Sequence, residues 1–330
     1  MALENGAASE KTLLSQPPGG ERHGVGAKGL SLFTVVWFIV GATAGSGLMG
    51  LPHALLQIGW VGVAVMIALA VGGMYTGHIL GRCQVLIRER CGEQTELLRY
   101  PYPAIGHVSY GPKLRILISV FLDVTMLGES VVFLLLAAEN TSAFLHDFHV
   151  HVSACCLMVV IVVVLCPVCW CGTPKDFWPL AICASSTMLI ASVLLVATML
   201  EDVPKRLASS YHVPFKWDKF LMSFGTIFYA YGTHPSFPTF QTDMKQPQKF
   251  TTVVLVSFTV ISVVYLLISI EGYLVYGSTI QDNLLLSVAP GPLLSTVQVL
   301  ITLHLFCTFV MALNPVSQEA EELLNIPPSK

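Results

Sequence analysis

The sequence predicts an all-α, polytopic membrane helical bundle. Of its 330 residues, 54% are hydrophobic and only 11% are charged, a balance typical of a chain that crosses a bilayer several times. Eight apolar stretches of about 20 residues can be found by hydropathy, and of the 17 Lys and Arg residues only Arg115, at the start of the third stretch, lies inside one. Glycine and proline interrupt the first and the sixth of these stretches, so we expect helices 1 and 6 to be broken.

The expected domain organisation is simple. Residues 1–29 are polar and rich in Gly, Ser and Pro, which favours a disordered cytosolic tail, and residues 30–330 form one transmembrane domain. The tail lacks the apolar core of a cleaved signal peptide. The eight expected spans are residues 32–57, 60–81, 114–138, 152–171, 177–200, 220–240, 253–276 and 293–313.

The first span carries the most informative stretch. No charged residue occurs from Leu32 to Gln57, and one continuous helix of that length would measure about 39 Å, more than the roughly 30 Å hydrocarbon core. Its glycines and Pro52 instead predict two half-helices with unwound backbone between them. Unwound backbone at membrane depth is tolerated where it is buried in protein or lines a wet cavity, so the break is a candidate binding site. Close helix packing through small residues is the alternative, and Gly41 and Gly45 have the right spacing for it.

The sixth span repeats this pattern. Residues 223–231 have helical character, and Gly232-Thr-His-Pro235 then interrupts them. Pro235 suits the first turn of a new half-helix. Two interrupted spans that lie five apart indicate a transporter built from inverted repeats.

The distribution of basic residues predicts the orientation in the membrane. With the amino terminus in the cytosol, 13 of the Lys and Arg residues fall on the cytosolic side and four on the other side. Asn140-Thr-Ser142 is an N-glycosylation sequon that this topology places outside the cytosol, so Asn140 is a candidate glycosylation site.

Ionisable residues inside the spans are candidates for function because buried charge is costly. Asp123 and Glu129 are six residues apart and point about 120° away from each other on one helix, so they do not form a paired-carboxylate site by spacing alone. Glu271 lies near the outer end of the seventh span. His234 lies in the second break, where it could move protons, cap the half-helix or hydrogen-bond the freed backbone.

Enzymatic function is not expected. The sequence has no phosphate-binding loop, nucleophile elbow or zinc-protease helix, and its basic residues form no nucleic-acid patch. Nine cysteines are present without the spacing of a zinc site, which favours small apolar packing residues or reversible palmitoylation. We expect no cofactor, metal or nucleic-acid partner.

Three stretches resemble the amino acid/auxin permease family of secondary amino-acid transporters. They are Gly41-Ala-Thr-Ala-Gly-Ser-Gly-Leu-Met-Gly-Leu-Pro-His53, Phe228-Tyr-Ala-Tyr-Gly-Thr-His-Pro-Ser-Phe-Pro-Thr-Phe-Gln-Thr-Asp-Met-Lys245 and Gly272-Tyr-Leu-Val-Tyr-Gly277. The resemblance implies a LeuT-like fold of five-plus-five inverted repeats, and an amino acid as substrate. It also implies coupling to H⁺ or Na⁺, at the plasma membrane or at a vesicular or lysosomal membrane.

The expected site residues combine the two breaks with this resemblance. The residues expected to bind substrate are those of the breaks, namely Gly41, Thr43, Ala44, Gly45, Ser46, Gly47, Tyr229, Gly232 and Thr233. The candidates for ion coupling are Glu129, Glu271, His234, Thr302 and Thr308, and the two threonines are assigned by their position in the family. His304 and Thr308 share one helix face, where helix-to-helix hydrogen bonds are the simpler use.

The family usually has eleven spans, whereas eight are counted here. The second repeat is therefore expected to be incomplete, as in a partial gene product, a splice form or a true short protein. We expect a transporter of small or medium zwitterionic amino acids, because no Lys or Arg lies at mid-membrane depth in the spans to pair with a second carboxylate. A sensor that binds without transporting, or an inactive truncated form, is the alternative, and the lack of a repeated filter motif disfavours an ion channel.

Overall fold

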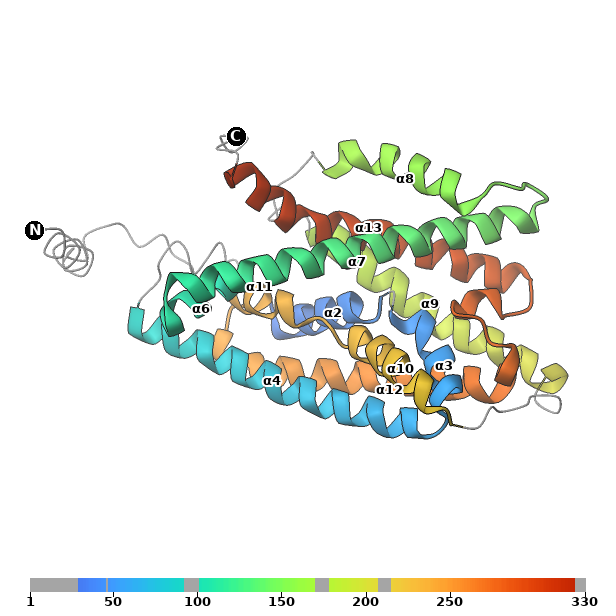
Figure 1. Cartoon of the computed structure of the whole chain (residues 1–330), viewed down its shortest axis with the longest axis horizontal. Helices are drawn as coiled ribbons and strands as arrows, with labels where there is room; N and C mark the ends of the chain where they lie inside the picture. Colours follow the sequence, from blue (N-terminus) through green and yellow to red (C-terminus); the bar gives the residue numbers. More distant parts are fainter. Residues whose placement is uncertain (1–28, 46, 92–100, 170–177, 207–214, 324–330) are drawn as a thin grey trace, which may run out of the picture.

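The computed structural model describes residues 29–45, 47–91, 101–169, 178–206 and 215–323 and is all-α, with no β-strand in these ranges (Figure 1). Its α-helices are α2 (Leu32–Thr43), α3 (Gly47–Ile58), α4 (Val61–Cys91), α6 (Pro101–Tyr110), α7 (Pro112–Asp147), α8 (Ala154–Cys169), α9 (Trp178–Arg206), α10 (Trp217–Ala230), α11 (Phe237–Thr242), α12 (Phe250–Tyr276) and α13 (Pro292–Leu323). The short 3₁₀ turn η3 (His234–Ser236) joins α10 to α11. The tail predicted at residues 1–29 lies almost entirely outside the described residues.

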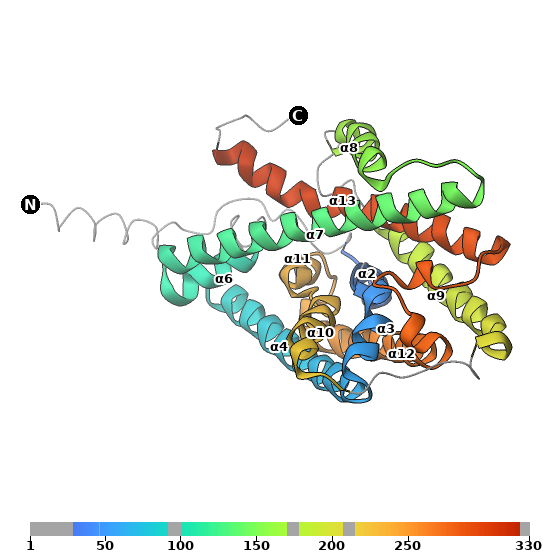
Figure 2. The same cartoon turned by 45° about the vertical axis from the view of Figure 1, so that its right-hand side comes forward.

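The helices form a bundle in which the four half-helices lie between two groups of longer helices. Figures 1 and 2 show α7, α8 and α13 along one side, α4 and α12 along the other, and α2, α3, α10 and α11 between them. Helix α12 packs against α2, α3, α4 and α9, whereas α13 packs against α7 and α9. Many large apolar side chains on the outer faces of α4, α7 and α8 are exposed, as expected of surfaces that face lipid.

Five helices of the described chain are long and apolar enough to cross a membrane, and six if α2 and α3 count as one span with a bend of 55°. Two of the eight spans expected from hydropathy contain helices that are too short to be counted among these five. Helix α8 has 16 residues and α10 has 14, so they measure about 24 and 21 Å. Helix α6 and the extensions of α4, α7, α9 and α13 beyond the expected spans were not anticipated.

The two broken helices lie side by side and run in opposite directions. At one end, the Leu30 N–H donates to Asp243 O (2.7 Å) and the Lys245 N–H donates to Leu30 O (3.0 Å), which ties the start of α2 to the end of α11. At the other end, α3 packs on α10, with Gly50 facing Thr226. The breaks themselves meet in the middle of the bundle. This antiparallel arrangement brings together residues that are about 190 positions apart in the sequence.

Glycine permits two close approaches between these helices. A Cβ atom on Gly41 would lie 2.1 Å from Ser185 Oγ and 2.4 Å from Ser185 Cα on α9, and one on Gly47 would lie 2.5 Å from Ala230 Cα on α10. The two Cα atoms belong to the backbone, which cannot move aside as a flexible side chain can. Gly41 and Gly47 therefore serve close helix packing, which was the alternative interpretation of the small residues in the first span.

Substitution of Gly41 by Ala is expected to destabilise the protein by about 1–3 kcal/mol, because the added methyl group must push α2 away from α9. The matched control is Gly72→Ala on α4, where a Cβ would meet nothing within 4 Å, and where alanine favours the helix. Thermal unfolding in detergent checks this. Equal melting temperatures for the two variants would show that the α2–α9 contact is not tight.

Candidate functional site

One tyrosine joins the two breaks. Tyr265, in the middle of α12, is completely buried, and its hydroxyl oxygen lies 2.5 Å from Thr43 O and 2.8 Å from Ala230 O. Thr43 ends α2 and Ala230 ends α10, so both carbonyl groups lack the N–H partner that a continuing helix would supply. The hydroxyl donates its hydrogen between them and holds the two helix ends together.

Two threonines form a second link between the breaks. The hydroxyl groups of Thr43 and Thr233 are 2.5 Å apart, and the Thr43 hydroxyl also donates to Ile39 O at 2.6 Å. Because the only hydrogen of the Thr43 hydroxyl is used in this way, Thr233 donates to Thr43. Thr43 is buried and Thr233 is half-buried, so the link lies inside the bundle.

The electrostatic character of the site follows from the helix ends. The carboxyl ends of α2 and α10 converge at Tyr265, and each end carries the negative pole of a helix dipole. Helix α3 begins across the break at Gly47, and its first N–H groups give the positive pole of a third helix. A ligand that carries both a positive and a negative group would suit this pattern of opposite poles.

The structure brings most of the predicted substrate residues together. Thr43, Ala44, Gly45 and Thr233 lie where the breaks meet, and Tyr229 and Gly232 lie at the end of α10. Ser46 lies outside the described residues. Tyr265 was missed by sequence reasoning, although a tyrosine within an apolar span is a signal, because a buried hydroxyl needs a partner.

His234 is bound to a neighbouring helix. Its Nε2 atom lies 2.8 Å from Thr76 Oγ1 and 3.1 Å from Gly73 O on α4, and its ring packs beside Phe237 and Phe258. Gly73 and Thr76 lie within the continuous helix α4, so these contacts attach the second break to α4 and do not involve backbone that the break has freed. Gln84 reinforces the same junction, since its amide donates to Pro238 O at 2.9 Å.

The other candidates for ion coupling are spread over three helices. Glu129 is half-buried on α7, one turn before Phe133, whose ring edge faces Gly45. Glu271 lies six residues beyond Tyr265 on α12, about 9 Å along the helix, and one of its carboxylate oxygens is buried without a hydrogen-bond partner. The Thr308 hydroxyl donates to His304 O within α13. Thr302 is half-buried on the same helix, six residues before Thr308.

The predicted glycosylation of Asn140 does not fit the structure. Asn140 is completely buried near the end of α7, and its side-chain oxygen accepts a hydrogen bond from Asn283 Nδ2 at 2.8 Å. A glycan is attached through Nδ2, which is buried, so glycosylation of Asn140 would have to open the bundle. The sequon is a local pattern and carries no information on the burial of its asparagine.

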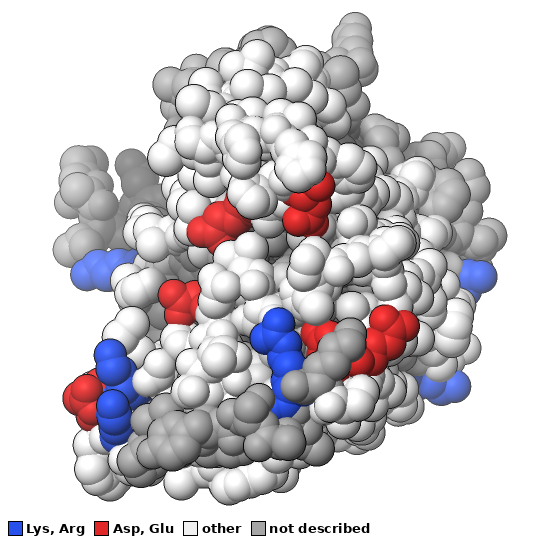
Figure 3. Space-filling model, turned by 90° about the vertical axis from the view of Figure 1, so that its right-hand side faces the viewer, with Lys and Arg blue, Asp and Glu red and all other residues white. Residues whose placement is uncertain are grey.

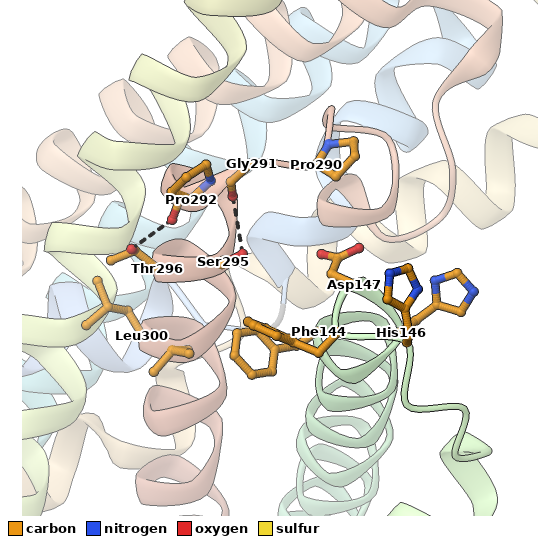
Figure 4. A pocket seen from close by; sticks show the side chains of 12 residues that line it. Phe144, His146, Asp147, Pro290, Gly291, Pro292, Ser295, Thr296 and Leu300 are labelled. Atoms are coloured by element: carbon orange, nitrogen blue, oxygen red, sulfur yellow. Dashed lines mark hydrogen bonds between the residues drawn. The ribbon is translucent and has the colours of Figure 1, made fainter.

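An open cavity lies away from the breaks. It measures about 960 Å³ and lies between the end of α7 and the start of α13 (Figure 4). Figure 4 shows Phe144 between the two helices, with Asp147 and His146 at the end of α7. No residue of either break lines it. Its walls are mostly apolar, so we place the functional site at the breaks.

Acidic and basic side chains are scattered over the end of the bundle in Figure 3, and in several places the two signs lie next to each other. His53 Nδ1 of α3 and Asp282 Oδ1 form one contact of 2.7 Å. Among the residues that Figure 3 colours, neither sign gathers into an extended patch. This face offers no extended charged surface for a nucleic acid.

Comparison with known proteins agrees with this architecture. The family described as "Transmembrane amino acid transporter protein" matches residues 28–328. The amino acid transporter AVT1J of Arabidopsis thaliana is 24% identical over 286 residues, which is 84% of this chain and 65% of the relative. AVT1B of the same plant is 27% identical over 298 residues, 86% of this chain and 52% of the relative. The vesicular inhibitory amino acid transporter of Macaca fascicularis is 24% identical over 245 residues, 71% of this chain and 46% of the relative.

The chain is therefore a polytopic helical membrane protein built around two broken helices. It belongs to the transmembrane amino acid transporter family. It spans between about half and two thirds of the length of these relatives. These relatives are transporters, not enzymes, in agreement with the expectation from sequence.

Replacement of Tyr265 by Phe is expected to destabilise the protein by about 1–3 kcal/mol, because two buried carbonyl groups lose their shared donor. Tyr75→Phe on α4 is the matched control, since Tyr75 is 65% exposed. The measurement is the thermal melting temperature of each purified variant in the same detergent. An unchanged melting temperature for Tyr265→Phe would contradict the bridging role.

Proposed function

We propose that this chain acts in secondary active transport of neutral amino acids across a membrane, with the substrate bound where the two breaks meet. The observation that carries the proposal is the contact between the carboxyl ends of α2 and α10 through Tyr265, at the centre of a membrane-embedded bundle. Carbonyl groups freed at the helix ends suit a positive group, and N–H groups at the start of a half-helix suit a negative one. A zwitterion supplies both. Family membership supports an amino acid as the substrate.

The antiparallel broken helices support a LeuT-like inverted repeat. In such a fold, rocking of one group of helices against another exposes the site alternately to the two sides of the membrane. The hydrogen bond between the hydroxyl groups of Thr43 and Thr233 then belongs to a conformation in which the two breaks are in contact. We place the amino terminus in the cytosol on the basis of the excess of Lys and Arg on that side.

Coupling to H⁺ or to Na⁺ is part of the proposal, and the two ions make different demands. A proton needs a titratable group near the site, for which Glu129, Glu271 and His234 are the candidates. Sodium needs oxygen ligands, for which Thr302 and Thr308 are the candidates. A plasma membrane, a vesicular membrane or a lysosomal membrane is compatible with either ion.

Reconstitution into liposomes tests the proposed function. The full chain should accumulate labelled alanine above its equilibrium level when an inward proton or sodium gradient is imposed, and an ionophore that dissipates the gradient should abolish this. Empty liposomes are the control. Binding of alanine without accumulation under either gradient would support a sensor in place of a transporter.

Selectivity between neutral and acidic amino acids is a further expected outcome. Residues 32–58 and 220–242 contain no Lys or Arg, so a second substrate carboxylate has no fixed cation beside the breaks. Burial of an unpaired carboxylate costs several kcal/mol. Unlabelled glutamate should thus compete with labelled alanine at least tenfold less effectively than unlabelled serine does. Equal competition by glutamate and serine would overturn this selectivity.

A further inference from the structure

Two histidine rings meet at the turn that joins α7 to α8. His146 lies in the last turn of α7, where Figure 4 shows it, and His151 lies three residues before α8. Their ring centroids are 4.9 Å apart, and the ring planes make an angle of 72°. Both side chains are exposed, so a solute reaches them directly from solution. The sequence predicted no metal site, since the two histidines are five positions apart and only the turn brings their rings together.

The backbone of this turn is fixed by hydrogen bonds. The His149 N–H donates to His146 O at 2.9 Å, and the Val150 N–H donates to Leu145 O at 3.0 Å. This pair of bonds is the Schellman motif that commonly ends a helix. His149 occupies its left-handed position, with φ of 62°, where glycine is usual. The chain therefore folds back sharply and places residue 151 beside residue 146.

The two rings border a space with room for a hydrated ion. A cavity of about 290 Å³ is lined by both histidines and by the hydroxyl-bearing residues Ser142 and Ser153. The Ser142 hydroxyl donates to Val152 O at 2.8 Å, which ties the segment after the turn to α7. Among the described residues that line this cavity, none is Lys or Arg. One water molecule occupies about 30 Å³ in the liquid, so an ion and several waters fit.

The residue type and the spacing match a divalent transition metal. Neutral imidazole binds Zn²⁺ at about 2.0–2.1 Å, and two imidazole rings on one tetrahedral ion have centroids about 5 Å apart. Rotation of the exposed side chains can then direct one nitrogen of each ring toward a shared ion. The carboxyl end of α7 carries the negative pole of its helix dipole, which also favours a cation. In the described part of the chain, no third His, Cys, Asp or Glu joins this pair, so water supplies the other ligands.

We propose that His146 and His151 bind one Zn²⁺ ion, or a similar divalent transition-metal ion, in the cavity beside the turn between α7 and α8. The site is separate from the breaks and does not depend on the proposed transport function. On the topology predicted from the basic residues, it lies outside the cytosol. With two protein ligands the site is reversible, and a bound ion links the end of α7 to the segment that leads into α8.

Calorimetric titration of the untagged full chain in lipid nanodiscs with ZnCl₂ tests the proposal. His146→Gln and His151→Gln each remove one ligand at an exposed position, and each should raise the Kd for Zn²⁺ roughly tenfold or more. His149→Gly is the matched control. It removes an imidazole from the same turn while glycine suits the left-handed backbone, so its Kd should equal that of the unmodified chain.

The double variant His146→Gln/His151→Gln separates one shared ion from two independent ones. With a shared ion, either single change already destroys the chelate, so the double variant should bind Zn²⁺ little more weakly than either single variant. Two independent ions would instead leave one site of unchanged Kd in each single variant, and this result would overturn the proposal.

Two other results would also overturn it. One is the absence of Zn²⁺ binding by the unmodified chain. The other is a loss of affinity in His149→Gly as large as that in His146→Gln, because the ion would then lie on the other side of the turn. Titration with MgCl₂ is the control for the ion, since Mg²⁺ prefers oxygen ligands and should show no difference among the variants.

Discussion

Backbone carbonyl groups that lose their helical partners inside a membrane must find donors elsewhere, and the Tyr265 hydroxyl supplies one to both broken helices. The packing of the two broken helices against each other depends on this constraint. Without a shared donor, the ends of α2 and α10 would each need water or a continued helix. With it, two segments from distant parts of the sequence meet in a buried core, and the negative ends of both helix dipoles point toward Tyr265.

The close approach of the half-helices has a second requirement, which is the absence of side chains at chosen positions. Gly41 and Gly47 let helix backbones approach each other closely, and a Cβ on Gly45 would lie 3.2 Å from His304 Nε2. Of the two interpretations of the small residues that the sequence left open, close packing is therefore confirmed at Gly41 and Gly47. The binding site at the break stays a prediction.

Much of the fold could be predicted from the sequence because hydropathy and helix breakers act locally. The interruptions at Gly45 and Gly232 were expected from glycine and proline content, and each falls between two helices. The partners of single residues could not be predicted in this way. Gly41 and Gly45 have equivalent spacing, yet one meets Ser185 and the other faces His304. The burial of Asn140, the attachment of His234 to α4 and the bridge of Tyr265 likewise depend on helices that lie far away in the sequence.

The central claim is that the two breaks form one amino-acid site. Hydrogen–deuterium exchange of the full chain in nanodiscs, with and without saturating alanine, tests this most directly. The claim predicts that alanine slows amide exchange around Gly45 and around Gly232 together, with little change around Phe144 and Pro292 beside the open cavity. Protection confined to the cavity, or to one break without the other, would contradict it.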